Sequence, residues 1–530
     1  MRIILNAGKL LLQKMLAPFS TSDKMNIYLT PSQRDRLKDY QEYWNFYNGY
    51  HWENIVEDDR QEFTTNWCAR FVNKYVATEF NSGFLFKFDK DVEEKVLPFL
   101  NNVWDDNNGS DLMAKVGQEK SITGDAYVHV FFESAEDVND PFKMYPKGRI
   151  RLFNIPSSLV FPKYKDGYND SFDALESVTI MYPIETEGIL GNAHERIVRF
   201  VYTNETITKY VDGEEEFSIE NKYGVIPIVP FRNLALSGSN FGQSDLRDLI
   251  DLNIEYNLKS SDISQILEYN AAPTTIVQGA KPNNLTKGAN KTWLVPKDAK
   301  VYNLELKGDL TASTTYINRV IDSIYNVGSM PKLAIGGDTA PSNLSGIALQ
   351  ISFMPLTDLI DQKRVQTAKS IIQINKIALR IGVVENLISI PQNIDAFKFY
   401  NHNIWWGDIL PKDMVTELEM IQSELKSGLT TREDAMIRLY KDNVTDLSKR
   451  VEEDVKKYPQ FYGINPLSMP TGNRLVNTFD GSIIVKQDET SEKVSNTTQQ
   501  VDLKNTVGRN RNGEDKKLNS GLQNFNPPKE

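Results

Sequence analysis

The chain has 530 residues, of which 40% are hydrophobic and 25% are charged. This composition is typical of folded proteins, and the length predicts about three or four domains. The formal net charge of −11 argues against a protein that holds nucleic acid tightly, because affinity for phosphates comes from basic side chains. The single cysteine, Cys68, excludes a disulfide framework within the chain and a cysteine-rich metal site, and it fits a reducing compartment.

Residues 1–30 contain an apolar segment that Lys9 and Lys14 interrupt. We expect an amphipathic helix that packs on the body of the protein; the alternative is a helix that touches a membrane surface. No apolar run reaches the ~20 residues that a membrane-spanning helix needs. Stable membrane insertion is therefore not expected.

Residues 31–243 combine helical and strand patterns. Thr30 and Pro31 mark the start of a first helix, and Gly49 marks its end. Between Gly124 and Phe231 the hydrophobic period changes to two, which predicts strands; Asp212-Gly213 predicts a hairpin turn there. The expected helices are 31–48, 66–80, 92–104 and 111–123, and the expected strands are 84–88, 126–132, 149–153, 159–161, 177–182, 196–202, 206–211 and 214–219. This part is expected to be an α+β domain with a mostly antiparallel sheet.

Residues 244–330 are expected to project from this domain as a helix, a small β module and a returning helix. The first helix covers 244–270, the β module 271–308 and the second helix 309–330. Short strands are expected at 274–277, 292–295 and 300–306. Lysines gather in the β module, among them Lys281, Lys287 and Lys291. They predict either a solvated positive face or a contact with phosphates or an acidic partner.

Residues 331–344 are expected to form a flexible polar loop, which includes Gly336, Gly337, Asp338, Thr339, Ser342 and Asn343. Residues 345–408 then begin with a long run of apolar residues at helical spacing. Pro355 lies inside this run, where a proline removes a helical hydrogen bond and costs ~3 kcal/mol. We therefore expect a long helix that is kinked at Pro355.

Residues 409–465 have the pattern of a helical unit. A helix over 412–427 is ended by Gly428, and Thr430 with Glu433 has the spacing of a capping box for the next helix, through residue 441. A charged helix is expected over 446–458. Residues 466–530 are polar and poor in aromatic side chains, and we expect them to be largely disordered, above all from Gln487 onward.

No pattern in the chain predicts catalysis. Gly288-Ala289-Asn290-Lys291-Thr292 matches only the end of a phosphate-binding loop, because the first glycine and the Gly-Lys pair are missing. The histidines lack acidic or cysteine partners at metal-ligand spacing; they are His51, His129, His194 and His402. We therefore expect no catalytic residue, no metal ligand and no cofactor. The alternative is a metal-dependent nuclease with a dispersed acidic site, which would leave no local motif.

The order of the expected elements resembles the portal proteins of tailed bacteriophages, of the SPP1-like type. Three stretches carry the resemblance: Tyr43–His51 with Asn66–Gly83; the helix, β module and helix from Ser244 to Val327; and Pro341–Leu359, with Ser345-Gly346-Ile347-Ala348-Leu349 and Pro355-Leu356. The segment from Gly428 to Glu433 and the helices after it also fit. The resemblance covers residues 31–458.

The resemblance implies a portal-like α+β fold. Its parts would be a wing over 31–243 with an antiparallel sheet, a helical stem over 244–270 and 309–330, a β clip over 271–308, a tunnel loop over 331–344, a long kinked helix over 345–408 that returns to the wing, and a helical crown over 409–465. The N-terminal segment 1–30 and the tail 466–530 lie outside the pattern.

The resemblance also implies a function without enzymatic activity. Copies of the chain would form a ring, expected to be a dodecamer, at one vertex of the capsid in the virion, after assembly in the host cytoplasm. Double-stranded DNA would pass through the ring during packaging and ejection. The implied partners are the terminase large subunit, the major capsid and scaffolding proteins, and a head-completion or tail adaptor protein.

The tunnel loop would line the narrowest part of such a ring. Its segment from Gly336 to Asn343 has one charged side chain, Asp338, and Gly336-Gly337 permits several backbone conformations. A lining with few lysines makes few fixed phosphate contacts, so DNA could slide past it. Lys281, Lys287 and Lys291 of the clip would touch a partner or DNA. The rival interpretations are the nuclease and a peripheral membrane protein anchored by residues 1–17.

Overall fold

The computed structural model describes most of the chain up to residue 457 and two short strands beyond it. The described residues are 24–52, 62–138, 140–165, 172–187, 193–271, 274–279, 297–304, 310–336, 346–410, 414–431, 434–436, 439, 444–457, 474–476 and 483–485. The chain divides into two compact units, Met1–Lys412 and Asp413–Glu530. Each unit is described by itself. The expected N-terminal amphipathic helix lies almost wholly outside the described residues.

A five-stranded antiparallel sheet forms the outer layer of the first unit. Its strands follow one another in chain order: β4 (Val160–Tyr164), β5 (Leu175–Glu187), β6 (Ala193–Tyr202), β7 (Thr206–Val211) and β8 (Glu214–Glu220). The expected hairpin between β7 and β8 is confirmed, since Val211 pairs with Glu214 and only Asp212-Gly213 connects them. Both turn residues have positive φ, 51° and 91°, as a two-residue hairpin loop requires.

A three-stranded sheet lies between this outer sheet and the helices. Strand β2 (Asp125–Glu133) is central, flanked by β3 (Arg149–Ile155) and by β9 (Ile228–Arg232), which the sequence analysis did not single out. Alternate residues of β2 face opposite sides, as the strand period requires. Val128 and Val130 belong to the core with the helices, whereas Tyr127 belongs to the core with the outer sheet. The first unit therefore has a helical layer and two larger sheets, besides two-stranded ones, which confirms the α+β class.

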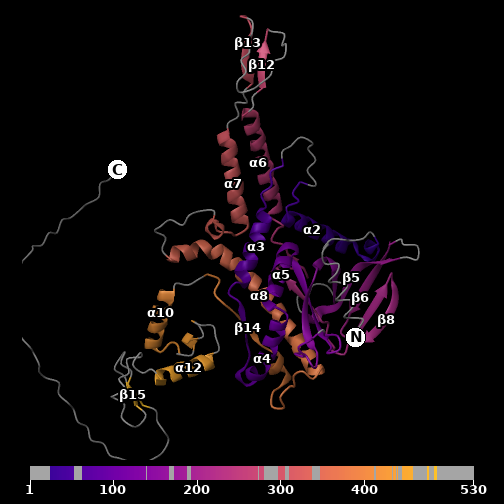
Figure 1. The fold of residues 1–530 in the computed structure, drawn as a ribbon, viewed down its shortest axis with the longest axis vertical. Coiled ribbons are helices and arrows are strands. Elements are labelled where there is room, and N and C mark those ends of the chain that lie inside the picture. Colours follow the sequence, from indigo (N-terminus) through magenta and orange to yellow (C-terminus); the bar gives the residue numbers. More distant parts are fainter. Residues whose placement is uncertain are drawn as a thin grey trace, which may run out of the picture. The chain divides into compact units, whose positions relative to one another are not determined.

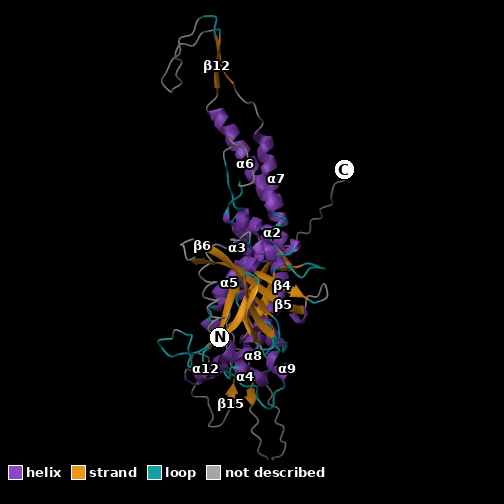
Figure 2. Ribbon diagram, turned by 90° about the vertical axis from the view of Figure 1, so that its right-hand side faces the viewer, coloured by secondary structure: helices purple, strands orange, loops and turns teal. Residues whose placement is uncertain are grey.

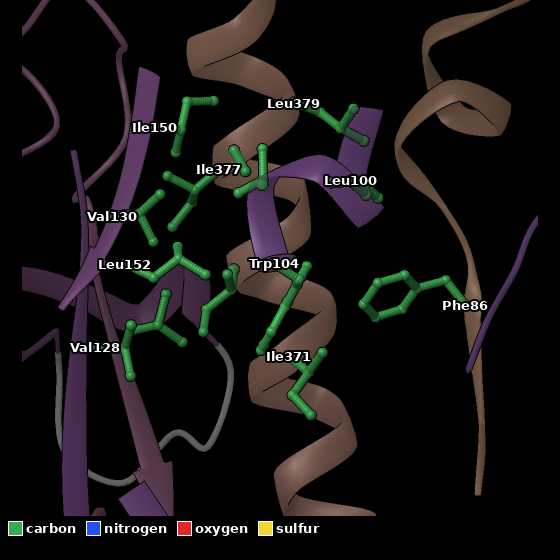
Figure 3. Close-up of a cluster of buried hydrophobic side chains, with 14 of the residues drawn as sticks. Phe86, Leu100, Trp104, Val128, Val130, Ile150, Leu152, Ile371, Ile377 and Leu379 are labelled. Atoms are coloured by element: carbon green, nitrogen blue, oxygen red, sulfur yellow. The ribbon is translucent and has the colours of Figure 1, made fainter. Parts of the chain in front are cut away.

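Four helices precede this sheet, close to the expected ranges: α2 (Pro31–Asn48), α3 (Trp67–Phe80), α4 (Lys90–Asp106) and α5 (Gly109–Thr123). Thr30 and Gln33 form a capping box at the start of α2, and Gly49 ends the helix with a φ of 90°, as expected. Figure 3 shows side chains of α4 and of helix α8 (Gly346–Val384) meeting the three-stranded sheet. Strand β1 (Phe84–Lys87) pairs with β14 (Asn403–Trp406), far along the chain.

A helical hairpin projects from the body, with two strands at its tip (Figures 1 and 2). Helix α6 (Ile250–Ala271) leads to β12 (Thr274–Gln278), which pairs antiparallel with β13 (Lys300–Leu304) before α7 (Leu310–Val327) returns. The expected start of α6 at Ser244 is wrong. The Ser244 hydroxyl donates to the carbonyl of Ile122 and accepts from the amide of Leu246, which holds this segment in a turn. The strand expected at 292–295 lies outside the described residues.

The longest helix, α8 (Gly346–Val384), has 39 residues and contains Pro355. A short 3-10 helix, η4 (Lys332–Ile335), occupies part of the segment expected to be a loop. In Figure 1 the ribbon of α8 changes direction along its length and leads away from the foot of α7. The position of the kink at Pro355 stays a prediction. Helix α9 (Ala396–Tyr400) follows and leads into β14.

The second unit contains α10 (Met414–Ser427) and α12 (Val444–Lys457), and strands β15 (Arg474–Val476) and β16 (Ile483–Val485). Gly428 ends α10 with a φ of 71°, as expected. The cap of the next helical segment is Thr431 with Asp434, one residue later than predicted: the Thr431 hydroxyl accepts from the Asp434 amide and donates to its carboxylate. The range 486–530, which holds most of the predicted disordered tail, lies outside the described residues.

Candidate functional site

The predicted site residues fall largely outside the part of the chain that the structure describes. This holds for Lys281, Lys287 and Lys291 of the β module, and for Gly337, Asp338, Thr339, Ser342 and Asn343 of the loop. Gly336 is described: it ends η4 with a φ of 74°, in the left-handed region that favours glycine. Pro355 lies within α8. The elements that precede and follow the loop are therefore described next.

Helix α3 holds the chain just before the loop. The Tyr75 hydroxyl donates to the carbonyl of Gly328, and the Arg70 guanidinium donates to the carbonyl of Ile335. A Cβ on Gly328 would lie 2.3 Å from the Phe71 ring, so only glycine fits there. Met330, between the two anchored carbonyls, is buried. The loop therefore begins from a fixed point on α3.

In the described part of α8 the fully buried side chains follow Pro355, while Phe353 before it is partly buried against the same core. Leu356 and Ile360 belong to the core that α3, α6 and α7 share. Before the proline, Leu349, Ile351 and Met354 are exposed. Pro355, which removes a helical hydrogen bond, therefore lies just before Leu356, the first fully buried side chain in the described part of α8.

The root of the projecting hairpin is fixed by polar side chains on α6. Asn253 accepts from the backbone amides of Trp67 and Cys68 and donates to the carbonyl of Thr65. One turn later, Asn257 accepts from the Thr65 amide at 2.9 Å and pairs with the ring of His51 at 2.8 Å. These asparagines accept from amides at and just before the start of α3, where helical amides lack intrahelical partners. The sparse apolar stripe predicted for α6 therefore reflects a polar buried face.

Two buried ion pairs join α8 to the elements around it. Lys120 of α5 donates to Glu79 of α3 and to Thr367 of α8, both at 2.7 Å. Lys363 of α8 pairs with Asp245, just before α6. All four charged side chains are nearly or wholly inaccessible to solvent. Burial lowers the pKa of Lys120, and the neighbouring Lys363 lowers it further, against the opposing effect of Glu79.

Sequence reasoning missed these ion pairs. Lysines and acidic residues within amphipathic helices are usually solvated, and no spacing in the chain marks the four charged residues as partners. A weak signal exists on α8, where Lys363, Thr367 and Ser370 share a helical face at intervals of three or four residues. All three are buried. The spacing of these polar residues is the feature of the sequence that could have indicated that they are buried together.

The titratable groups that burial perturbs do not form a catalytic set. Burial raises the pKa of the Cys68 thiol to about 12 and lowers the pKa values of His129 and His402 to about 4. These three side chains belong to different parts of the first unit. Within the described ranges, no group of three or more histidine, cysteine or acidic residues is placed to hold a metal ion. An activated cysteine nucleophile is not supported, because the thiolate is the reactive form.

One cleft of about 670 Å³ lies beside α2, with side chains of both charges in its lining. At its base Asp125 accepts from the Gly242 amide at 2.9 Å and from the Tyr40 hydroxyl at 3.0 Å. Burial raises the pKa of Asp125 to about 6, although these hydrogen bonds and the charge of Arg36 oppose the shift. Asp125 is therefore a structural carboxylate held by donors.

The hairpin of α6 and α7 is weakly acidic. Its two helices contain five acidic and two basic residues, which gives a net charge of −3. The Tyr316 hydroxyl of α7 donates to Glu255 of α6 at 3.0 Å and ties the helices together. Leu267 and Val327 are exposed apolar side chains on these helices. None of the described helices is long and apolar enough to cross a membrane.

Comparison with solved structures gives matches of low identity to chains of a gene transfer agent particle. One, from "Virion of native gene transfer agent (GTA) particle", is 12% identical, covers 76% of this chain and 93% of that chain, and has a TM-score of 0.41. Two others come from necks of the native and the empty particle, with 12% and 11% identity and TM-scores of 0.39 and 0.42; each covers 70% of this chain and 89% of that chain. These low scores carry no argument about assembly.

No curated protein sequence matches the chain. A family model does: the model of "Phage portal protein, SPP1 Gp6-like" matches residues 28–457. The match runs from the end of η1 (Met25–Tyr28) through the three- and five-stranded sheets, the projecting hairpin, α8 and α12. It favours a portal role over the nuclease alternative, and the portal family is a structural rather than an enzymatic class. The chain belongs to the SPP1 Gp6-like family of phage portal proteins.

Proposed function

We propose that copies of this chain form a closed ring, a dodecamer, at one vertex of the capsid, and that double-stranded DNA passes through the ring during packaging and ejection. The observation that carries the proposal is the family match over residues 28–457. In the ring, the helical hairpin would be the stem, the β12–β13 tip the clip, and residues 331–344 the tunnel loop. The protein itself performs no catalysis; the terminase would supply the ATP hydrolysis.

Exposed apolar side chains on the described helices support a ring. Leu267 on α6, Val327 on α7 and Ile351 on α8 are exposed apolar side chains on helices, and such side chains favour burial against another surface. A cyclic arrangement gives every subunit the same head-to-tail interface, which buries these side chains in all copies.

The weak negative charge of the hairpin supports a conduit rather than a grip. Each fixed contact between a basic side chain and a phosphate adds affinity through counterion release. A stem with a net charge of −3 and a loop segment, Gly336–Asn343, whose one charge is Asp338 would form few such contacts. DNA could then slide through the channel without being held.

We further propose the partners and the place of assembly. The clip would dock the terminase large subunit during packaging and later a head-completion or tail adaptor protein. The wing and crown would face the major capsid and scaffolding proteins, and assembly would take place in the host cytoplasm before the ring becomes part of the virion. The lysines Lys281, Lys287 and Lys291 would serve the clip contact.

The first test is the mass and shape of the purified protein, by light scattering and negative-stain electron microscopy, with and without the scaffolding protein. We expect rings with a central hole and a mass near twelve subunits. The double variant Leu267→Glu/Val327→Glu should shift the mass toward the monomer, because it places charges in the proposed interface. Ile27→Glu, at an exposed apolar residue outside the hairpin, is the matched control. Monomers under both conditions that cleave DNA with added metal would contradict the proposal and favour a nuclease.

A further inference from the structure

The last strand of the five-stranded sheet, β8, is an edge strand with little cover. In the described part of the chain it pairs with β7 on one side and with no strand on the other (Figure 1). Its side chains are exposed except for Phe217, which is partly buried. An edge strand of this kind presents unpaired backbone amides and carbonyls, with which another stretch of extended chain can pair.

The hairpin of β7 and β8 is strongly acidic. Residues 206–220 contain five acidic residues and one lysine, which gives a net charge of −4. That lysine, Lys209, pairs with Glu216 at 2.7 Å, and Lys222, just after β8, pairs with Glu385. The remaining glutamates of β8 are all exposed: Glu214, Glu215 and Glu220. Charges at an edge keep the strands of other molecules away, and the same charges attract a basic segment.

A largely apolar cavity of about 260 Å³ lies beside the far end of β8. Strand β2, the ends of β6, β7 and β8, and the turn after β8 form its walls. Ile219 of β8 is 39% exposed there. The other large apolar side chains of the lining are Phe131, Phe132, Tyr202, Ile207 and Pro227. His129 also lines the cavity, and burial lowers its pKa to about 4, so its ring is neutral at pH 7. The cavity therefore favours an apolar occupant.

The described part of the chain begins beside the other end of β8. Lys24, the first described residue, donates to the carbonyl of Glu195 at 3.0 Å. Tyr28 of η1 lies against the β7–β8 turn, where a Cβ on Gly213 would be 3.4 Å from the Tyr28 hydroxyl. The Arg199 guanidinium lies 5.6 Å from the centre of the Tyr28 ring. The chain before Lys24 therefore starts from a fixed point at the turn that leads into β8.

Residues 1–23 are long enough to follow β8 from this point to the cavity. From Gly213 to Ile219 the strand spans about 20 Å, because a strand rises by roughly 3.3 Å per residue. Residues 17–23 span up to about 25 Å when they are extended. Leu16, just before them, can therefore reach the cavity.

The same segment has the charge and the apolar side chains that this surface calls for. Residues 1–23 contain three basic residues and one acidic residue, which gives a net charge of +2, opposite in sign to the charge of the hairpin. Leu12, Met15 and Leu16 stand at the intervals of three and four residues that place side chains on one helical face. Such a face matches the apolar lining of the cavity.

We propose that residues 1–23 dock on their own subunit. Residues 17–23 run along the free edge of β8, antiparallel to it, because the segment leaves from the turn before β8 and has to reach its last residue. Leu12, Met15 and Leu16 then cover the cavity. The docked segment closes the edge of the sheet against pairing with other chains. Ring formation is not required for this contact, so the proposal is independent of the proposed function.

A disulfide cross-link in the full-length chain tests the contact. Leu16→Cys/Ile219→Cys should form an intramolecular disulfide in most molecules after mild oxidation, because a disulfide needs Cα atoms within about 7 Å of each other. Peptide mass spectrometry without reduction measures it, and the buried Cys68 does not compete. Leu16→Cys/Phe397→Cys is the matched control and should give little product, since Phe397 is 74% exposed on α9, which packs with α4 and α8.

Hydrogen exchange of the β8 amides gives a second readout. These amides should exchange at least about tenfold faster in a variant that lacks residues 1–22 than in the full-length chain, whereas the amides of the central strand β5 should not change. Lys9→Glu/Lys14→Glu should lower the yield of the disulfide between positions 16 and 219, and so should added salt.

Three results would overturn the proposal. The first is the absence of the intramolecular disulfide, and the second is unchanged exchange of the β8 amides on truncation. The third is a disulfide that doubles the mass of the chain, which would place the segment on a neighbouring copy. If the disulfide is absent and the full-length chain floats with anionic vesicles while the truncated variant does not, the segment belongs to a membrane surface instead.

Discussion

Single residues in this chain are constrained most strongly where charge is buried. Asp125 is enclosed at the start of β2, and Tyr40 and the Gly242 amide donate to it. Its raised pKa means that the folded state binds the proton more tightly than the unfolded state does. The contribution to stability is therefore complete below the ordinary pKa of an aspartate, and it is lost as the pH rises through about 6.

The variant Asp125→Asn tests this linkage. The free energy of unfolding of the wild type minus that of the variant should fall between pH 4 and pH 6, by at most about 3 kcal/mol for a shift of this size. Urea unfolding at several pH values measures it. Asp212→Asn is the control, since the hydrogen bond from Arg196 lowers the pKa of Asp212. The free energy of unfolding of the wild type minus that of this variant should rise with pH, below about pH 4. The change should be smaller than for Asp125, because the Asp212 side chain is half exposed. A difference that stays constant for Asp125→Asn would refute the linkage.

Among the elements, α8 is the one whose placement depends on buried charge. Lys363 pairs with Asp245 and also lies 4.6 Å from the centre of the Tyr75 ring, while Lys120 reaches Thr367. A buried ion pair adds little net stability over an apolar pair, but one partner without the other is costly. We infer that these pairs define how α8 is positioned against α3, α5 and the root of α6.

Lys363→Met should cost about 3–5 kcal/mol in the free energy of unfolding, because it leaves Asp245 buried and charged without its cation. The double variant Lys363→Met/Asp245→Asn should regain a clear part of that loss. Chemical denaturation measures both. Lys163→Met, in the exposed pair with Glu176, is the control and should cost less than about 1 kcal/mol. Equal losses for the single and the double variant would show that the charge of Asp245 is not the cause.

In the described part of the first unit, contacts fix the chain on both sides of the predicted tunnel loop. Arg70 and Tyr75 fix the chain up to Ile335, and Leu356 fixes it again after Pro355. A change in the shape of the tunnel loop would therefore be confined to the residues between these points. The stem and the wing would keep their positions while DNA passes.

Replacing Gly336-Gly337 with prolines should reduce DNA packaging while leaving rings intact. Proline fixes φ near −65°, which conflicts with the φ of 74° at Gly336, and it stiffens the start of the loop. Packaged DNA per particle and ring formation by electron microscopy are the measurements. Gly224→Pro is matched, since Gly224 has a φ of 68° and, like Gly336, no atom within 4 Å of an added Cβ. Normal packaging by the double proline variant would exclude loop movement as a requirement.

Local chemistry explains which elements could be predicted. Helix α2 was predictable because Thr30, Pro31 and Gly49 are strong local signals for its two ends. The β7–β8 hairpin was predictable because Asp-Gly suits its turn. Strand β9 was missed, since Ile228–Arg232 is short, contains a proline and is buried on both faces, so no alternation marks it.

The candidate site could be predicted in outline only. The order of the helices, the glycine pair and Pro355 were visible in the sequence, because each is a local feature. The anchors were not: Arg70, Tyr75 and Asn253 reach their partners only after the chain has folded, across 265, 253 and 186 residues. Such pairings depend on tertiary packing, which no short pattern encodes. The role of the loop residues themselves stays a prediction.

Because its single cysteine is buried, this protein can be labelled with a dye at a chosen position. Cys68 is fully buried and its thiol pKa is raised to about 12, so at neutral pH it offers almost no thiolate to a maleimide dye. A cysteine placed at Ser342 would then be the one group that accepts a fluorophore, without removal of the native thiol. Energy transfer between dyes on different subunits could follow the loop in an assembled particle while DNA is being pumped.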